Sequence, residues 1–140
     1  MITRENKARV NEFWETLYRR DLDHLSTFFT PAATYTDVAT PADDLAVGPE
    51  QIVARLGLGI KKLEKYTHTP ILMVGEGDTV VTEHIENWGW HTGETVSFGF
   101  VSIHELIDGQ IDRWTDYWDL QTLLNSAPGW WIEEIASGYL

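Results

Sequence analysis

The segment Thr82-Glu83-His84-Ile85-Glu86-Asn87-Trp88 predicts a β-strand, and Trp114-Thr115-Asp116-Tyr117-Trp118 predicts its partner strand. Successive side chains of a strand point to opposite faces, so each segment gathers ionisable groups and indole rings on one face. These same-face sets are Thr82, His84, Glu86 and Trp88, and Trp114, Asp116 and Trp118. A carboxylate among apolar rings is costly unless it is paired or protonated, which indicates a site that performs chemistry.

Length and composition indicate one soluble, acidic domain. A chain of 140 residues holds one hydrophobic core, and we expect a single domain over residues 1–140. Lys and Arg number 10 against 22 Asp and Glu, and the formal net charge of -12 disfavours binding to nucleic acid or to an anionic membrane. The sequence has no cysteine, so disulfides and thiolate chemistry are excluded. The polar N-terminus and the lack of a membrane-length apolar run favour a cytoplasmic location.

Three segments show the apolar spacing of amphipathic helices. The first runs from Glu5 to Arg20, and a shorter one begins after Asp21 and ends before Pro31. The third starts at Gly48-Pro49, with proline in the first helical turn, and its apolar stripe continues to Leu63. A last short helix is expected from Asp119 to Leu124.

Five strands are expected, and tight turns join the last four. Their ranges are Ala33 to Val38, Thr69 to Val74, Thr79 to Trp90, Thr95 to Ile107 and Gln110 to Trp118. Helices that precede a strand meander predict an α+β fold, in which helices cover the concave face of a curved antiparallel sheet and enclose a pocket. The apolar tail from Pro128 to Leu140 is expected to close one end of that pocket or to pack on a second subunit.

The order of these elements, taken with the strand motifs, resembles the nuclear-transport-factor-2-like superfamily of α+β cones. That superfamily includes SnoaL-like polyketide cyclases, ketosteroid isomerases, scytalone dehydratases and limonene-1,2-epoxide hydrolases, and the resemblance covers the chain from Val10 to about Leu124. It is strongest for the limonene-epoxide hydrolases, whose third strand carries Thr-Glu-Arg-x-Asp and whose last strand carries Trp-Arg-Asp-Tyr-Phe-Asp. Here these motifs read Thr82-Glu83-His84-Ile85-Glu86 and Trp114-Thr115-Asp116-Tyr117-Trp118-Asp119. The resemblance implies a cone-shaped sheet of the cystatin-like half-barrel type, and a homodimer.

The resemblance also implies roles for five residues. In the hydrolases, a tyrosine and an asparagine of the first strand hold the attacking water, the last-strand Asp is the base, the third-strand Asp is the acid, and the Arg bridges both carboxylates. Tyr35 matches the tyrosine, Asp116 the base and Glu86 the acid. Asp37 replaces the asparagine and His84 replaces the arginine, so a third acid is added and the forked guanidinium is lost.

The function that this resemblance implies is the cofactor-independent, one-step opening of a small apolar epoxide by water. Asp116 would be the base and Glu86 the acid, and His84 would tie the two acids together and share their proton. Four aromatic side chains on the face of the strands that points into the pocket are expected to line it: Trp88, Phe98, Phe100 and Trp118.

Two other functions remain open. An isomerase, dehydratase or polyketide cyclase could use Asp37 with His84 to abstract and return a proton, because ketosteroid isomerases place their base at the matching point of the first strand. The positions of the isomerase's oxyanion donors are occupied here by Phe13 and, at or near its position, Val101. The third function is that of a binding protein, which would hold an apolar ligand without turnover.

Each candidate residue also has a purely structural interpretation. Asp116 could bond to Arg113, Glu86 could reach solvent near a hairpin end, and His84 could be a core histidine. His104 is interpreted as structural. Neither a metal nor another cofactor is expected, because three further histidines fall in predicted surface or turn segments without neighbouring metal ligands: His24, His68 and His91.

Overall fold

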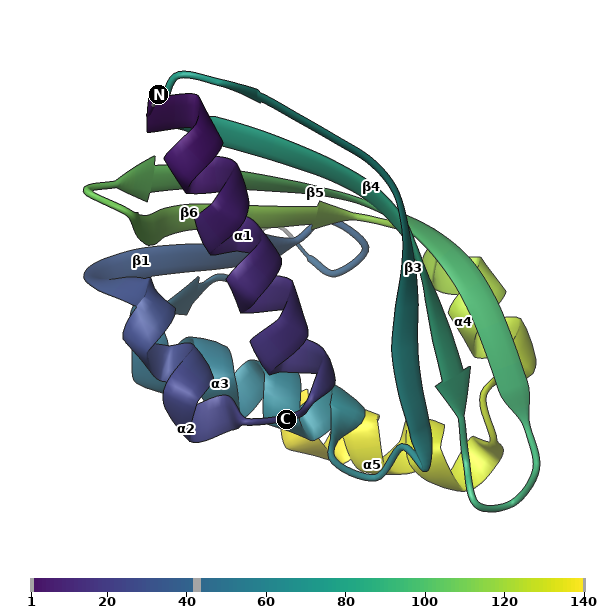
Figure 1. Cartoon of the computed structure of the whole chain (residues 1–140). Coiled ribbons are helices and arrows are strands. Elements are labelled where there is room, and N and C mark those ends of the chain that lie inside the picture. Colours follow the sequence, from purple (N-terminus) through teal and green to yellow (C-terminus); the bar gives the residue numbers. More distant parts are fainter. Residues whose placement is uncertain (1, 42–43, 140) are drawn as a thin grey trace.

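Figure 1 shows the computed structural model of the chain, which describes residues 2–41 and 44–139. Its helices are α1 (Ile2–Tyr18), α2 (Leu22–Leu25), α3 (Gly48–Ile60), α4 (Leu120–Ser126) and α5 (Gly129–Tyr139), and a 3-10 turn, η1, covers Ser26–Phe28. Its strands are β1 (Phe29–Asp37), β2 (Ala46–Val47), β3 (Lys65–Glu76), β4 (Thr79–Gly89), β5 (Thr95–Ile107) and β6 (Gln110–Tyr117). The predicted α+β class is confirmed.

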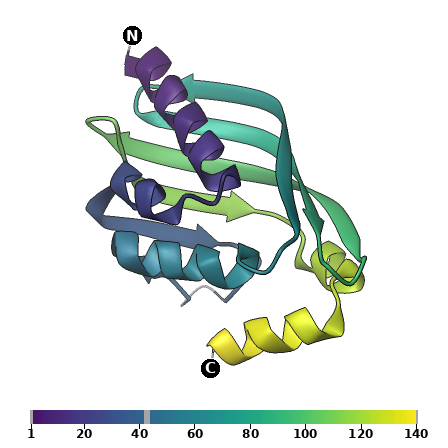
Figure 2. The same cartoon turned by 60° about the horizontal axis from the view of Figure 1, so that its bottom comes forward.

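One mixed sheet joins the strands of the described residues in the order β2-β1-β6-β5-β4-β3. β1 and β6 run parallel, whereas the other neighbouring pairs are antiparallel. The sheet curves strongly, with α1, α2 and α3 on its concave side and α5 at its open end (Figure 1 and Figure 2). β4 and β6, which we expected to pair, are instead separated by β5, and both hydrogen-bond to it.

β5 shows how the sheet separates its two faces. Its residues alternate between exposed and buried along most of its length, as expected for a strand with solvent on one side. The buried set contains Phe98, Phe100 and Ser102. A tight turn at Asp108 and Gly109, both with positive φ (50° and 79°), then returns the chain directly as β6. The pocket-facing side chains of β5 and β6 therefore share one face.

The aromatic core lies between α1 and the sheet. Phe13 of α1 is fully buried and meets Trp114 of β6 edge-to-face, with ring centroids 5.0 Å apart. Trp14 packs on His84 of β4, with centroids 4.6 Å apart. These contacts fix α1 across the sheet, so Tyr18, one turn after Trp14, also faces β4.

Several details of the predicted elements differ from the structure. The second helix ends at Leu25, and β1 starts at Phe29 after the 3-10 turn, so Pro31 lies inside a strand. Proline fits there because the β1–β6 register is irregular between Phe29 and Thr34. β3 starts at Lys65 because this edge strand pairs with β4 along its whole length. The two-residue strand β2 was not foreseen.

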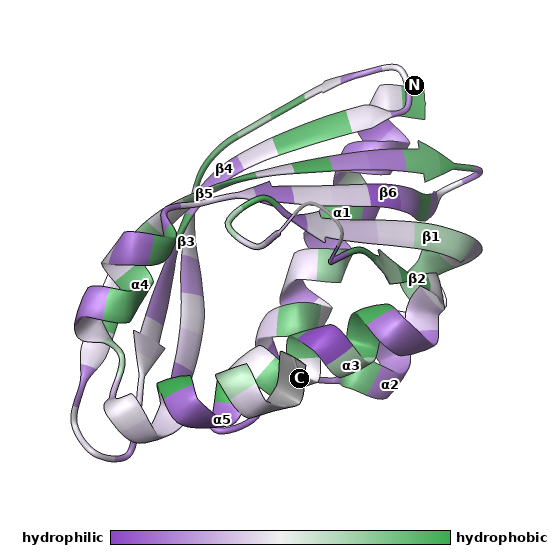
Figure 3. Cartoon of the chain, turned by 180° about the vertical axis from the view of Figure 1, so that it is seen from behind, coloured by the Kyte–Doolittle hydropathy of each residue, from purple (hydrophilic) through white to green (hydrophobic). Residues whose placement is uncertain are grey.

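The apolar tail forms α5 within its described part, and Leu140 lies outside the described residues. Trp131 is buried, and Ile132 and Ile135 are partly buried against the core. α5 runs next to α3 across the open end of the sheet, as Figure 3 shows from behind. No helix within residues 2–41 and 44–139 combines the length and apolarity that crossing a membrane requires.

Candidate active site

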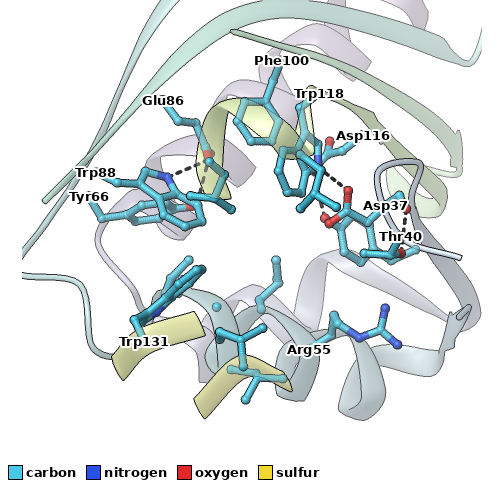
Figure 4. A pocket seen from close by; sticks show the side chains of 18 of the residues that line it. Asp37, Thr40, Arg55, Tyr66, Glu86, Trp88, Phe100, Asp116, Trp118 and Trp131 are labelled. Carbon is cyan, nitrogen blue, oxygen red and sulfur yellow. Dashed lines mark hydrogen bonds between the residues drawn. The ribbon is translucent and has the colours of Figure 1, made fainter. Parts of the chain in front are cut away.

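A cavity of about 280 Å³ lies between the concave face of the sheet and the helices, and Figure 4 shows it from close by. Side chains of the strands and of α3, α4 and α5 line it. Trp131 and Ile135 belong to this lining, so the apolar tail closes one end of the pocket, which is the first of the two positions expected for it. Three carboxylic acids interrupt a mostly apolar wall: Asp37, Glu86 and Asp116.

Asp116 is buried in the cavity wall on β6. Its Oδ1 accepts hydrogen bonds from Ser102 Oγ at 2.6 Å and from Trp114 Nε1 at 2.7 Å, and its Oδ2 accepts one from the Tyr35 hydroxyl at 3.0 Å. Arg113, the alternative partner, instead pairs with Glu105 at 2.8 Å. Burial raises the pKa of Asp116 to about 7 even though the three donors lower it. The carboxyl group therefore exchanges a proton near neutral pH while its orientation is fixed.

Glu86 occupies a similar setting on β4. Trp88 Nε1 donates to Oε1 at 3.0 Å, Tyr66 donates to Oε2 at 3.3 Å, and the Tyr18 hydroxyl donates to Oε2 through a short hydrogen bond. Burial raises the pKa of Glu86 to about 7, against the lowering effect of these donors. The side chain does not reach solvent, because the residue is only 5% exposed.

Strand alternation supplies one donor to each acid. Trp88 follows Glu86 by two positions and Trp114 precedes Asp116 by two, so each indole lies on the same face as its carboxyl group. The other donors come from distant segments, and three of these four were missed from the sequence: Tyr18, Tyr66 and Ser102. Ser102 could have been found from the sequence. It lies on the same face of β5 as Phe98 and Phe100, which strand alternation had already placed toward the pocket.

Asp37 ends β1 and lies beside Asp116, because the parallel ladder pairs the two residues directly. Its Oδ1 accepts a hydrogen bond from the indole nitrogen of Trp118. Burial and the charge of Asp116 raise the pKa of Asp37 to about 7, while Trp118, a backbone N–H and Arg55 lower it. This part of the wall thus holds two adjacent acids whose ionisation is coupled.

His84 lies behind the cavity wall rather than between the two acids. Its Nε2 is 3.0 Å from Ser102 Oγ, and its Nδ1 is 3.4 Å both from the Tyr18 hydroxyl and from His68 Nδ1. Burial, with the neighbouring His68, lowers the pKa of His84 to about 3, so the ring is neutral at pH 7. We expected His84 to contact both acids directly. It instead reaches Asp116 through the Ser102 hydroxyl and Glu86 through the Tyr18 hydroxyl.

The pair of Asp37 and His84 that an isomerase would use is not brought together. β6 and β5 lie between β1, which carries Asp37, and β4, which carries His84. Three steps of about 4.8 Å separate these strands. Asp37 bonds to Trp118 instead, and His84 bonds to Ser102.

Three of the four aromatic residues expected in the wall line the cavity: Trp88, Phe100 and Trp118. Phe98 is buried behind this lining, with its ring edge-on to Trp88 and to Trp118 at centroid distances of 5.1 and 5.7 Å. Strand alternation predicted that Phe98 is buried. It did not predict that the larger indole rings of Trp88 and Trp118 separate Phe98 from the cavity. Phe98 supports the wall without forming its surface.

His68 corrects a further expectation, since it lies in β3 and not in a surface or turn segment. Its half-buried ring stacks on Tyr18 with centroids 4.0 Å apart, and burial lowers its pKa to about 4. His104 is fully buried and stacks on Trp114. Two histidines are exposed: His24 and His91. Within the part of the chain that the structure describes, no group of three or more His, Cys, Asp or Glu is placed to hold a metal ion.

The fold and the site define a class of protein, a cone-shaped α+β domain of the nuclear-transport-factor-2-like type whose apolar pocket carries buried acids. The SnoaL-like domain family matches residues 10–114, and the chain belongs to this family. No curated protein matches the sequence significantly.

Solved structures with the same fold carry different descriptions. A putative SnoaL-like polyketide cyclase from Jannaschia sp. CCS1 has a TM-score of 0.79 at 18% identity, over 91% of this chain and 95% of that one. An LEH-like epoxide hydrolase from M. tuberculosis has a TM-score of 0.74 at 20% identity, over 88% and 89%. A hypothetical protein with a ketosteroid isomerase-like fold from Catenulispora acidiphila DSM 44928, in complex with trimethylamine, has a TM-score of 0.74 at 21% identity, over 84% and 89%. These similarities concern the fold alone.

Proposed function

We propose that this protein is an epoxide hydrolase that opens an apolar epoxide by one-step acid–base attack of water, without a cofactor. The observation that carries the proposal is a pair of buried carboxyl groups, Asp116 and Glu86, each with three hydrogen-bond donors and a pKa raised to about 7. General acids and bases work best when their pKa lies near the operating pH. Both groups line one cavity from the sheet, Glu86 on β4 and Asp116 on β6 (Figure 4), so a substrate in the cavity meets both.

Asp116 acts as the base. The adjacent carboxyl groups of Asp116 and Asp37 offer two acceptors to one water, whose oxygen then keeps a lone pair for attack. Asp116 takes a proton from this water while the water oxygen bonds to one epoxide carbon. The hydrogen bond from Tyr35 to Asp116 Oδ2 orients the carboxylate during this step.

Glu86 acts as the acid. Its burial raises its pKa to about 7, so a protonated form is available at neutral pH, and this form gives its proton to the epoxide oxygen as the carbon–oxygen bond breaks. The product is a diol, and the reaction leaves Asp116 protonated and Glu86 ionised. Each group contributes about 10²–10⁴-fold to the rate. Strain in the three-membered ring makes a covalent intermediate unnecessary.

The test is incubation with a panel of cyclic and terpene epoxides in ¹⁸O-labelled water. The wild type is expected to form diol with one ¹⁸O atom, and Asp116→Asn and Glu86→Gln are expected to lose this activity. Glu133→Gln, which changes an exposed carboxylate on α5, serves as the control. Folded wild-type protein that yields no diol from any epoxide would overturn the proposal.

A proton-transfer enzyme built on Asp37 is the second candidate. It is favoured by one observation, a cavity-lining carboxyl group with a pKa of about 7 that Trp118 holds in place. Asp37 would take a proton from carbon next to a carbonyl group. Cyclic ketones incubated in D₂O test this function: it requires deuterium uptake that Asp37→Asn abolishes, and no uptake by the wild type would exclude it for those ketones.

A further inference from the structure

A chain of four hydrogen bonds joins Asp116 to Glu86 behind the cavity wall. Asp116 Oδ1 is 2.6 Å from Ser102 Oγ, which is 3.0 Å from His84 Nε2. His84 Nδ1 is 3.4 Å from the Tyr18 hydroxyl, which also bonds to Glu86 Oε2. Ser102 and His84 are 0% and 1% exposed. None of the three inner residues belongs to the cavity lining, so a bound substrate does not interrupt the chain.

The inner residues carry three mobile protons for these four hydrogen bonds. A serine or tyrosine hydroxyl has one proton and can both donate and accept. A neutral imidazole has one N–H and one bare nitrogen, which also makes one donor and one acceptor. His84 is neutral because burial lowers its pKa to about 3. The chain therefore needs a fourth proton, and the two acids are its remaining source.

Counting protons separates the possible states of the acids. If neither acid is protonated, one of the four hydrogen bonds lacks a proton. If both acids donate into the chain, two protons face each other in one bond. With one acid proton, every bond has a donor and an acceptor: with Asp116 ionised, Ser102 donates to it, His84 Nε2–H donates to Ser102, Tyr18 donates to His84 Nδ1, and Glu86 donates to Tyr18.

We propose that Ser102, His84 and Tyr18 hold the pair of Asp116 and Glu86 in the singly protonated state, so that the base is ionised when the acid carries its proton. This role deepens the hydrolase function proposed above and rests on it, because one-step epoxide opening needs that state. The three are positioning residues, since they act through the two acids and do not line the cavity. In the other two protonation states, one hydrogen bond of this buried chain is not properly made. The free-energy cost of that hydrogen bond separates the two apparent pKa values of the acids by about one unit or more.

Other titratable groups surround the chain. His68 Nδ1 is 3.4 Å from the same His84 nitrogen as Tyr18, and Asp37 lies beside Asp116. Tyr66 donates to Glu86 and Tyr35 donates to Asp116, each from outside the chain. Tyr66 gives a matched control: it donates to the same oxygen of Glu86 as Tyr18 does, but the structure shows no hydrogen bond from it to His84 within the described residues.

The experiment compares Tyr18→Phe with Tyr66→Phe by ¹³C NMR titration of the carboxyl carbons of Asp116 and Glu86. Both variants remove one hydroxyl group that donates to the ionised form of Glu86, so both raise its pKa. Only Tyr18→Phe breaks the chain, and we expect its separation between the two apparent pKa values to be smaller than that of Tyr66→Phe by about one unit. Tyr66→Phe raises the pKa of Glu86 without breaking the chain, so we expect it to keep or widen the separation. His68→Phe is expected to keep the separation of the wild type within a few tenths of a unit.

A second readout follows the tautomer of His84 by ¹⁵N NMR at neutral pH. In the intact chain the ring nitrogen that holds the proton depends on which acid is ionised, so Asp116→Asn and Glu86→Gln are expected to change the tautomer in opposite directions. Equal changes of the pKa separation in Tyr18→Phe and Tyr66→Phe would overturn the proposal, as would a loss of separation in His68→Phe. Neither readout needs an epoxide, so failure of the hydrolase function and failure of this chain are distinguishable.

Discussion

Asp116 and Glu86 accept hydrogen bonds from the same kinds of donor, but they differ in the other residues that lie beside them. Each accepts hydrogen bonds from an indole of its own strand and from two hydroxyl groups. Asp116, however, lies beside another acid, Asp37, whereas the ring of Tyr66 packs on Tyr18 next to Glu86. Two adjacent carboxyl groups can orient a water, and a carboxyl group among aromatic rings keeps its proton. In the proposed mechanism, these neighbouring residues, more than the direct hydrogen bonds, distinguish the base from the acid.

The largest effect is expected where the two adjacent acids are changed separately. Asp116→Asn removes the proposed base and should lower kcat by about 10²–10⁴-fold. Asp37→Asn keeps a carbonyl acceptor for the water and should lower kcat by about tenfold or less. Steady-state kinetics on one epoxide measures both, with circular dichroism to verify folding. Equal losses, or a greater loss in Asp37→Asn, would reverse the assignment of the base.

The two indole donors should affect opposite limbs of the pH–rate profile. Loss of a hydrogen bond to a carboxylate raises its pKa by about one to two units. Trp114→Phe should move the acidic limb upward, because Asp116 must be ionised, whereas Trp88→Phe should move the basic limb upward, because Glu86 must be protonated. Trp130→Phe is the control, since this indole donates to Thr92 outside the cavity. If both variants shift the same limb, the roles of the two acids are not distinct.

The raised pKa values also predict how stability depends on pH. A carboxyl group whose folded pKa is raised contributes stability that is fully present below its ordinary pKa and is lost as pH rises through about 7. Between pH 4 and 8 the wild type should therefore lose stability relative to Asp116→Asn by up to about 4 kcal/mol, and relative to Glu86→Gln by up to about 3 kcal/mol. Urea unfolding at several pH values measures this difference. The buried histidines are common to all three proteins, so their opposite effect cancels. A difference that does not change with pH would contradict the raised values.

The smallest effect is expected for two neighbouring phenylalanines of β5. Phe100 lines the cavity and Phe98 lies behind it. Phe100→Leu should change KM for apolar epoxides by a few fold, because it alters the surface that the substrate contacts. Phe98→Leu should mainly lower the free energy of unfolding, by about 1 kcal/mol. The same change of KM in both variants would show that Phe98 and Phe100 do not differ in their contact with the substrate.

The sequence was informative where spacing within one strand decides the structure. Alternation predicted that Glu86 shares a face with Trp88, and Asp116 with Trp114, and both indoles donate to their acids. The tight turns around β5 set its strand boundaries as predicted, Thr95 to Ile107. These features depend on neighbours a few residues apart, which a single sequence displays directly.

The rest depends on contacts between distant segments. Tyr18 belongs to α1, and Ser102 belongs to the strand that separates the two motif strands, so their approach to the acids requires the strand order. The position of His84 followed from the motif, but its neighbours did not, and so its direct contact with the acids was predicted wrongly. His68 was misplaced because the length of β3 is set by its pairing with β4.

The central claim, direct attack of water activated by Asp116, is tested most directly by a single turnover in ¹⁸O-labelled water with enzyme in excess over epoxide. The account predicts that the first diol formed already contains one ¹⁸O atom and that Asp116 remains unlabelled. An unlabelled diol, with ¹⁸O then found in the carboxyl group of Asp116 by mass spectrometry of its peptide, would show attack by the carboxylate itself and contradict the account.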